Sequence, residues 1–227
     1  MHRTEVPALS HRPPPASSAP PGSAVPSRDS PSRTPFLLTP AARKDLRNRM
    51  LLFRQTGLDR IAGLTGAGEN ELRRYRRELS DSDLSDRLLQ RGASLAYTRE
   101  LPQAALLYLL VRAARPQRVV ETGVGPGYSS TWILAGLDAN GSGELFSLGP
   151  GTPHGRSRGL GAIPVGSFVP LSLRSRWTLV LGNTEERLAD IVRPEHGTDL
   201  FFSDNGPDPD RARFELHHAW DALAPTG

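Results

Sequence analysis

The stretch Gln117–Leu134, QRVVETGVGPGYSSTWIL, decides the fold of this chain. A short run with two valines comes first, three glycines follow at alternate positions, and a stretch with a helical pattern comes after them. Glycine has no Cβ, so it accepts positive φ and lets another group approach the backbone closely. The stretch therefore predicts a buried strand, a bare turn and a helix, which is the first half of a βαβ unit.

The same alternation continues to the end of the sequence. Runs typical of strands and stretches typical of helices follow one another at 143–149, 177–182, 184–192, 198–204 and 208–223. Short strands that alternate with helices indicate a parallel sheet. We therefore predict an α/β fold for residues 116–227, with a Rossmann-like parallel sheet of about four strands. The helix at 184–192 is expected to be capped by Thr184.

The first half of the chain is expected to be different. Residues 1–35 are dominated by proline and serine and have no apolar period, so they bury too little surface to offset their ordering entropy. We predict a disordered tail there and a helical segment over 36–115. In that segment, 101–117 is expected to form a buried helix, with prolines near its start and at its end. The arginine-rich run at 71–87 also contains acids, which is typical of a solvated helix.

Composition excludes several classes of function. The 227 residues fit one domain with a tail, and the absence of cysteine excludes disulfides and thiolate chemistry. No stretch approaches the ~20 apolar residues of a membrane span. The net charge of +4 includes arginine runs that acids neutralise, so we expect neither a nucleic-acid nor a membrane partner. A cytoplasmic protein is predicted; an organelle signal is the alternative, and the prolines of the tail disfavour it.

Two groups of aromatic residues are expected to be structural. His217 and His218 are adjacent on a helix, so they point to different sides and do not form a metal pair. No metal site is predicted. Trp132, Trp177 and Trp220 stand at positions that resemble core positions, which favours packing over contact with a substrate.

The glycine-rich turn does not fit two common phosphate-binding motifs. The third glycine of a dinucleotide fingerprint would fall at Tyr128, and a Walker A loop needs a lysine that is absent there. What remains is an acid at the strand end, Glu121, followed by Gly123, Gly125 and Gly127. Such a turn is suited to a ligand at the carboxyl end of the strand. The alternative is a tight strand-to-helix turn without a ligand.

The sequence ETGVGPG resembles motif I of the class I S-adenosylmethionine-dependent methyltransferases. Three further blocks, ANGSGELFSLG, RSRWTLVLGNTEERL and TDLFFSDNGPDPDRARFELHHAW, are similar to blocks of a bacterial small-molecule methyltransferase subfamily and follow in the same order. The resemblance covers roughly residues 100–227. It implies S-adenosylmethionine as the cofactor, a small-molecule substrate and methylation at oxygen. A dehydrogenase is disfavoured by the misplaced third glycine.

The resemblance also implies roles for single residues. It places Glu121, Gly123, Gly125 and Gly127 around the amino and carboxylate groups of the cofactor. Asn183 is implied near the adenine, with a turn residue as the alternative. Asp204 is implied beside the reacting methyl, where it would orient the substrate or act as a general base. The alternative for Asp204 is a cap of the following helix.

Several positions depart from the pattern of the family. Gly149 stands where such enzymes usually have an acid that binds the ribose hydroxyls, and Ser203 and Pro207 stand at two histidine positions. The sequence stops where a fifth strand would begin, so the C-terminal strands of the family are missing and the fourth strand keeps an open edge. A homo-oligomer through that edge is expected. A non-catalytic or degenerate methyltransferase-like fragment, acting only by association, is the alternative function.

Overall fold

A computed structural model describes residues 55–84, 88, 101–151, 163–206 and 208–223. The predicted tail at 1–35 lies outside these residues. The elements are, in order, α2 (Gln55–Thr65), α3 (Glu69–Asp81), α5 (Leu101–Ala114), β1 (Arg118–Thr122), α6 (Tyr128–Asn140), β2 (Glu144–Gly149), η2 (Leu171–Arg176), β3 (Trp177–Leu181), α7 (Thr184–Ile191), η3 (Pro194–His196), β4 (Leu200–Ser203) and α8 (Pro209–Trp220). Within the described ranges, no helix has the length and apolar character needed to cross a membrane.

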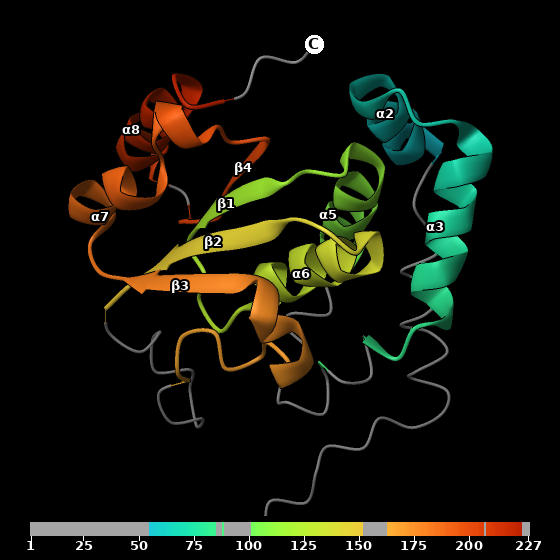
Figure 1. Cartoon of the computed structure of the whole chain (residues 1–227), viewed down its shortest axis with the longest axis horizontal. Coiled ribbons are helices and arrows are strands. Elements are labelled where there is room, and N and C mark those ends of the chain that lie inside the picture. The colour runs from blue at the N-terminus through green and yellow to red at the C-terminus, as the bar shows by residue number, and fades with distance from the viewer. Residues whose placement is uncertain (1–54, 85–87, 89–100, 152–162, 207, 224–227) are drawn as a thin grey trace, which may run out of the picture. The chain divides into compact units, whose positions relative to one another are not determined.

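The sheet confirms the predicted α/β class with four parallel strands (Figure 1). Its order is β3-β2-β1-β4, and every neighbouring pair is parallel. The chain runs outward from β1 through β2 to β3, and then returns to the other side of β1 to form β4. The carboxyl ends of β1 and β4 therefore meet at the point where the direction of the sheet reverses. In open α/β sheets, ligands bind at this point.

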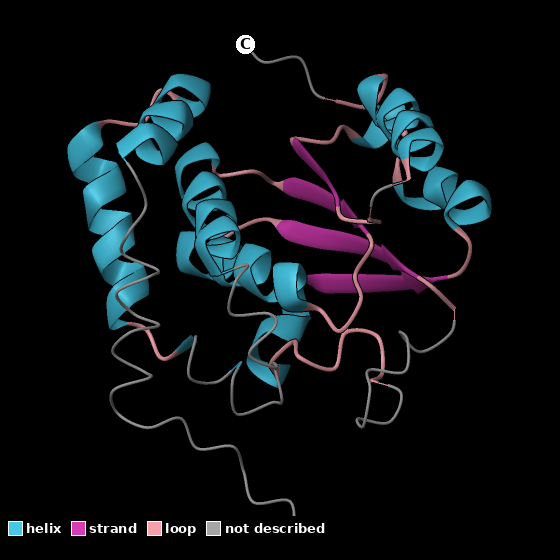
Figure 2. Cartoon of the chain, turned by 180° about the vertical axis from the view of Figure 1, so that it is seen from behind, coloured by secondary structure: helices cyan, strands magenta, loops and turns pink. Residues whose placement is uncertain are grey.

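Each face of the sheet is covered by one pair of helices (Figures 1 and 2). Val119 of β1 and Leu145 of β2 contact α5 and α6, in a core that includes Leu134. The next residue along β1, Val120, packs on the opposite face with Leu188 of α7. Successive side chains of a strand point to opposite faces. The two polar residues that follow in β1, Glu121 and Thr122, therefore also lie on opposite faces of the sheet.

The helices α2 and α3 pack on α5 in a third core, beyond the α5–α6 layer. The arginine-rich α3 is a solvated helix, as predicted, with one buried stripe formed by Leu72, Tyr75 and Leu79. These positions are three and seven residues apart, the spacing of one helical face. The run of arginines therefore lies around the solvent side of a helix that is anchored by three apolar or aromatic residues.

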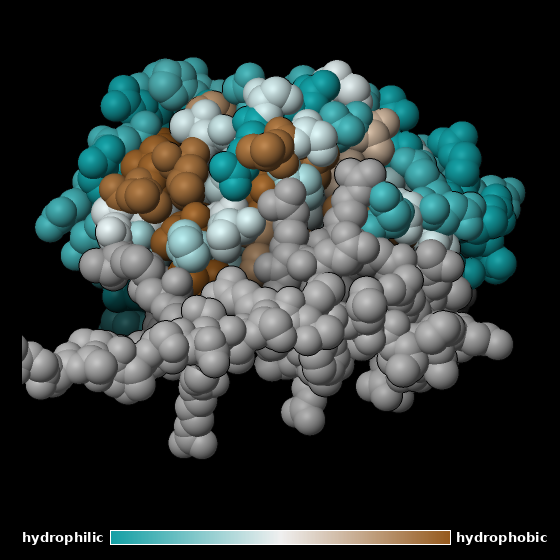
Figure 3. All heavy atoms as spheres, turned by 90° about the horizontal axis from the view of Figure 1, so that it is seen from below, coloured by the Kyte–Doolittle hydropathy of each residue, from teal (hydrophilic) through white to brown (hydrophobic). Residues whose placement is uncertain are grey.

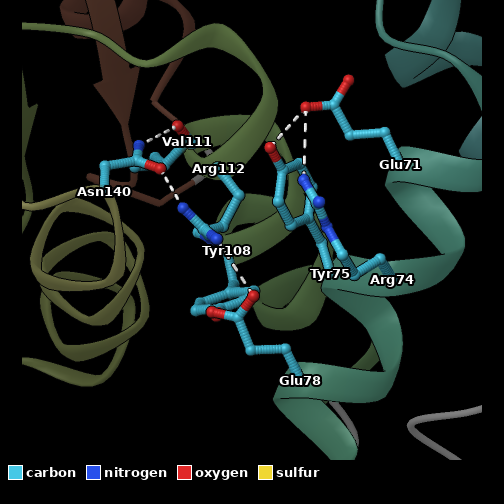
Figure 4. A network of polar contacts seen from close by, with 8 residues as sticks. All are labelled: Glu71, Arg74, Tyr75, Glu78, Tyr108, Val111, Arg112 and Asn140. Atoms are coloured by element: carbon cyan, nitrogen blue, oxygen red, sulfur yellow. Dashed lines mark hydrogen bonds and ion pairs between the residues drawn. The ribbon is translucent and has the colours of Figure 1, made fainter.

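A polar network joins α3 to α5 and α6 (Figure 4). Arg112 of α5 is 8% exposed, and its guanidinium lies 4.3 Å from the centre of the Tyr75 ring. It forms an ion pair of 3.0 Å with Glu78 of α3 and donates to Asn140 of α6. The hydroxyl of Tyr108 donates to the same glutamate at 2.7 Å. Because Arg112 contacts all three helices, it fixes α3 against the sheet-covering layer.

We expect Arg112→Met to lower the free energy of unfolding by roughly 2–4 kcal/mol, because Glu78 and Asn140 lose a largely buried donor. The matched control is Arg73→Met. Arg73 pairs with Glu69 on the exposed side of α3, with both side chains about half exposed, so its loss should change the stability by less than about 0.5 kcal/mol. Urea unfolding measures both, and equal effects would contradict a structural role for the Arg112 network.

Two sequence-based expectations are wrong. The cap of α7 is Asn183 and not Thr184, because the Asn183 side chain accepts from the Glu185 N–H. Trp220 is 75% exposed, whereas Trp132 is buried as expected. In α8 the buried positions are Glu215 and Ala219, and the next residue is rotated by about 100° from that face.

Apolar side chains form separate patches among hydrophilic ones when the molecule is seen from below (Figure 3). Among the described residues, the large apolar side chains that are most exposed are Leu64, Leu171, Leu181, Leu216, Trp220 and Leu223. Three of these lie in α8 or directly after it. His217 and His218 are exposed.

Candidate functional site

The site predicted from the sequence lies where β1 and β4 end. A glycine loop, residues 123–127, follows β1, and a second loop follows β4 and carries Asp204. The two loops touch, since a Cβ built on Gly123 would lie 2.4 Å from the carbonyl carbon and oxygen of Asp204. The Asp204 N–H also donates to the carbonyl of Thr122 at 2.9 Å. The structure therefore brings Gly123 and Asp204 together, as the topology of the sheet requires.

The glycine loop has the left-handed backbone that its composition suggested. Gly123, Gly125 and Gly127 have φ values of 85°, 49° and 93°. Gly127 is the N-cap of α6 and provides no side-chain oxygen to the first turn of that helix. A helix start capped in this way presents backbone N–H groups and the positive end of the helix dipole, which suits an anionic group.

Glu121 is buried beneath this loop and is 0% exposed. Its carboxylate accepts hydrogen bonds from the hydroxyls of Ser129 at 2.5 Å, Ser130 at 2.6 Å and Ser147 at 2.7 Å. Ser147 in turn accepts from the indole N–H of Trp177 at 2.9 Å. Glu121 and Ser147 are register partners, so both point toward α6. The carboxylate thus ties the start of α6 and strands β2 and β3 to the end of β1.

Burial raises the pKa of Glu121, and this effect outweighs the three hydroxyl donors, which favour the charged form. The charge of Asp204 adds to the increase. A carboxyl whose pKa is higher in the folded than in the unfolded protein contributes stability below its ordinary pKa of 4.5. That contribution is lost as the pH rises through the higher value.

We therefore expect Glu121→Gln, which cannot titrate, to gain stability relative to the wild type as the pH rises from the ordinary glutamate value. The difference should grow by up to about 1.4 kcal/mol for each pH unit within the window between the two pKa values. Urea unfolding of both proteins from about pH 4 to about pH 8 measures it. A difference that is independent of pH would contradict the raised pKa.

A second buried carboxylate, Glu215 of α8, lies on the opposite face and holds the other loop. It is 0% exposed and accepts from Thr122 at 2.8 Å and Ser203 at 2.7 Å, as well as from the side-chain amide of Asn205. Thr122 and Ser203 are register partners on the face that α8 covers. The residues on either side of Asp204 are therefore both anchored to one carboxylate.

Sequence reasoning missed Glu215. Its donors lie between 10 and 93 residues away, so no local motif connects them. The available signal was an acid on the stripe of α8 that includes Ala219, which is buried. An acid at a core position needs several donors.

For Asp204 and Asn183 the sequence also allowed purely structural roles, a helix cap and a turn residue. The N-cap of α8 is Asp208, which accepts from the N–H groups of Asp210 and Arg211, so the expectation that Asp204 caps this helix is wrong. The Asp204 side chain is exposed. Asn183 does have a local role, as the cap of α7. That role uses only its amide oxygen, so its nitrogen is the atom that a ligand contact would use.

Residues 163–170, which we call the covering segment, lie against the glycine loop. The N–H of Gly166 donates to the carbonyl of Gly125 at 3.0 Å, and the N–H of Phe168 donates to that of Pro126 at 2.8 Å. Gly125, Pro126 and Gly127 are all buried. The same segment reaches the end of β2, where a Cβ on Gly149 would lie 2.8 Å from Val165. Two backbone carbonyls of the glycine loop therefore face this segment.

Residues 120–227 match the family model of the methyltransferase domain. This part of the chain is therefore similar to a methyltransferase domain. The match begins within β1 and includes both the glycine loop and the loop that carries Asp204. No curated protein sequence matches the chain.

Solved structures that are similar to part of this chain include three methyltransferases. The SAH-bound methyltransferase PaMTH1 of Podospora anserina is 16% identical, with a TM-score of 0.47, over 77% of this chain and 68% of that one. The O-methyltransferase TomG of Streptomyces achromogenes, in complex with SAM, is 21% identical, with a TM-score of 0.43, over 64% and 62%. The O-methyltransferase of Bacillus cereus, in complex with SAH, is 20% identical, with a TM-score of 0.40, over 74% and 67%. The chain thus spans about two thirds of the length of these proteins.

The matched region brings two anchored loops together at the switch point. Within the described ranges, no three histidine, aspartate or glutamate side chains are grouped so that they could hold a metal ion. The predicted contacts of Glu121, Gly123, Gly125, Gly127 and Asn183 with a cofactor stay predictions. The catalytic role of Asp204 also stays a prediction.

Proposed function

We propose that this chain is an S-adenosylmethionine-dependent methyltransferase that methylates a small molecule at oxygen. The observation that carries the proposal is the glycine loop, with three positive φ values, at the switch point of a region similar to a methyltransferase domain. The resemblance of four sequence blocks to small-molecule methyltransferases supports the substrate class.

The residues present suit the methionine part of this cofactor, but they do not suit its ribose. The glycine loop and the start of α6 suit the methionine part, which carries a carboxylate. At the other end, Gly149 offers no acid to the ribose, and Val165 occupies the space of a side chain there. A hydrogen bond to a charged group is worth about 1.5–3 kcal/mol, so we expect weaker binding of the cofactor than in enzymes that have this acid.

S-adenosylmethionine supplies an electrophilic methyl group when bound. The chain's own residues would then position the substrate and move a proton. Asp204 is exposed beside Gly123, and as a carboxylate it would accept the proton of a substrate hydroxyl. Glu121 acts indirectly, because its carboxylate holds the start of α6 in place. Asn183 would donate its amide N–H to the adenine.

Calorimetric titration with S-adenosylhomocysteine, the product form of the cofactor, tests the proposal. Binding in the micromolar range that Gly125→Val abolishes would support it, since a β-branched residue at a φ of 49° distorts the loop. Gly141→Ala, in the turn after α6, is the control for a general effect of replacing a glycine with positive φ. No binding to a demonstrably folded protein would overturn the proposal.

A second candidate is a non-catalytic protein that keeps the fold and acts only by association. The loss of an acid at Gly149 and the burial of the glycine loop favour it. The same titration separates the two candidates, because this second function needs no cofactor.

We also propose association of two copies through the edge formed by β4. Among the described residues, β4 lies at one edge of the sheet, and only a single bridge, Thr198 to Leu223, lies on its outer side. Leu216 and Trp220 add exposed apolar surface on α8. Sedimentation velocity at increasing concentration tests this association, and a monomer at every concentration would overturn it.

A further inference from the structure

The carboxyl end of β2 is lined by aliphatic side chains. Gly149, the last residue of β2, has no side chain of its own there. A Cβ built on it would lie 2.8 Å from a methyl of Val165, 3.4 Å from the Cβ of Val124 and 3.6 Å from a methyl of Leu181, and these are the three nearest heavy atoms beyond the adjacent residues. None of these side chains can donate or accept a hydrogen bond. We call Gly149 and these three side chains the apolar wall.

The apolar wall stands where a Rossmann-like sheet recognises a ribose. In dinucleotide-binding sheets, an acid about 20 residues beyond the glycine-rich turn accepts a hydrogen bond from a ribose hydroxyl. Thr122 and Leu148 are register partners, so Gly149 lies beside Gly123, the first residue of the glycine loop. The ribose of an adenosyl ligand held by the glycine loop is therefore expected next to the apolar wall.

The backbone at this end of β2 is poorly suited to replace an acid. The carbonyl of Leu148 accepts from the Gly123 N–H at 3.0 Å, and the carbonyl of Gly149 accepts from the Gly182 N–H at 2.9 Å. Both carbonyls therefore already have a partner. The next residue, Pro150, has no N–H to donate.

The two acids nearest to Gly149 in the sequence stand at the other end of β2. Glu144 is the first residue of this strand, so it lies about 16 Å from Gly149 at the rise of a β-strand. Asp138 lies in the last turn of α6 and pairs with Arg176 at 3.8 Å. The Arg176 guanidinium also donates to the carbonyl of Gly143, which precedes β2. Neither acid can take the place of a carboxylate at the end of β2.

We propose that the apolar wall makes the site indifferent to the ribose hydroxyls, so that the chain does not select its ligand through them. This inference rests on the proposed function, since it concerns the ribose of the cofactor. A site that binds a hydroxyl through a buried polar group rejects a ligand that lacks the hydroxyl, because the polar group is left unpaired. An apolar surface cannot strongly reject either form. Selection then depends on the glycine loop and on the other parts of the ligand.

The test is calorimetric titration of the unchanged full chain with S-adenosylhomocysteine and with its 2′-deoxy and 3′-deoxy analogues. We expect the three dissociation constants to agree within about twofold. Recognition of the hydroxyls by a charged group would instead weaken binding of an analogue roughly tenfold to a hundredfold. A loss of that size with either analogue overturns the inference.

A pair of variants builds the opposite case. Val165→Ala removes the methyl that a side chain at position 149 would meet, and Gly149→Asp in this background places a carboxylate at the end of β2. The double variant should bind S-adenosylhomocysteine roughly tenfold more tightly than Val165→Ala does, and it should lose this gain with a deoxy analogue. Val165→Ala alone is the matched control, and it should not distinguish the three ligands. A folded double variant without any gain would show that the ribose does not lie at the apolar wall, and would overturn the inference.

The outcomes separate this inference from the proposed function. Equal binding of the three ligands by the wild type supports the apolar wall. Binding of S-adenosylhomocysteine with a tenfold loss for an analogue overturns the apolar wall and leaves the proposed function standing. If the folded wild type binds none of the three, the proposed function fails and the inference fails with it.

Discussion

Gly123→Ala is expected to lower the free energy of unfolding by roughly 3–5 kcal/mol. Two costs add at this position. The φ of 85° strains any residue that has a Cβ. The new methyl would also lie 2.4 Å from two backbone atoms of Asp204, which cannot rotate away as the end of a side chain can.

The control Gly141→Ala separates these two costs. Gly141 has a similar φ of 73°, and nothing lies within 4 Å of a Cβ built there. Only the backbone strain applies, so the expected loss is about 1–2 kcal/mol. Urea unfolding of both variants gives the difference. If the two losses are equal, the loop that carries Asp204 does not lie on Gly123, and the geometry of the switch point is wrong.

Most of the fold was predictable from the sequence, because the signals are local. The β-branched run before Glu121, the glycines after it and the helical pattern beyond them each report on a few neighbouring residues. Four strand-like runs, three of them followed by a helical stretch, indicate a parallel sheet. The position of Gly149 at the end of β2 also followed from counting along a predicted strand.

The candidate site was predictable only in part, because burial is a property of the whole fold. The sequence placed Glu121 at a strand end, but it did not indicate that three serines from α6 and β2 surround this carboxylate and make it an anchor. Glu215 was missed for the same reason. The contacts of Gly166 and Val169 with the glycine loop join residues about 40 positions apart, and no pattern in the sequence indicates them.

For Trp220 the sequence predicted burial, and the side chain is exposed. A tryptophan near the end of an amphipathic helix favours the core on average, yet a shift of one position along a helix moves a side chain from the core to the solvent. The buried stripe of α8 is occupied by Glu215 and Ala219, so the large side chain beside them is directed into solvent. An acid inside and a tryptophan outside invert the usual preference, and three polar donors make the inversion possible.

Glu215→Leu is expected to lower the free energy of unfolding by roughly 3–5 kcal/mol, because the side chains of Thr122, Ser203 and Asn205 lose their common acceptor in a buried place. Glu215→Gln keeps the volume and one acceptor oxygen, and hydroxyl donors can rotate toward it, so a smaller loss of about 1–3 kcal/mol is expected. Glu195→Leu, an exposed acid in η3, is the control and should change the stability by less than about 0.5 kcal/mol.

The same variants show whether Glu215 holds the loop that carries Asp204. The Asp204 N–H is bonded to the carbonyl of Thr122, so hydrogen exchange at this amide reports whether the loop stays on β1. In Glu215→Leu it should exchange faster by more than the loss of global stability explains, whereas amides in the middle of α6 should follow the global change alone. Two results would contradict the role of Glu215 as an anchor. One is a Glu215→Leu variant that is as stable as the wild type; the other is an Asp204 amide whose exchange speeds up no more than that of the α6 amides. Because Glu121 holds the glycine loop separately on the other face, S-adenosylhomocysteine binding measured well below the unfolding transition should be retained in Glu215→Gln.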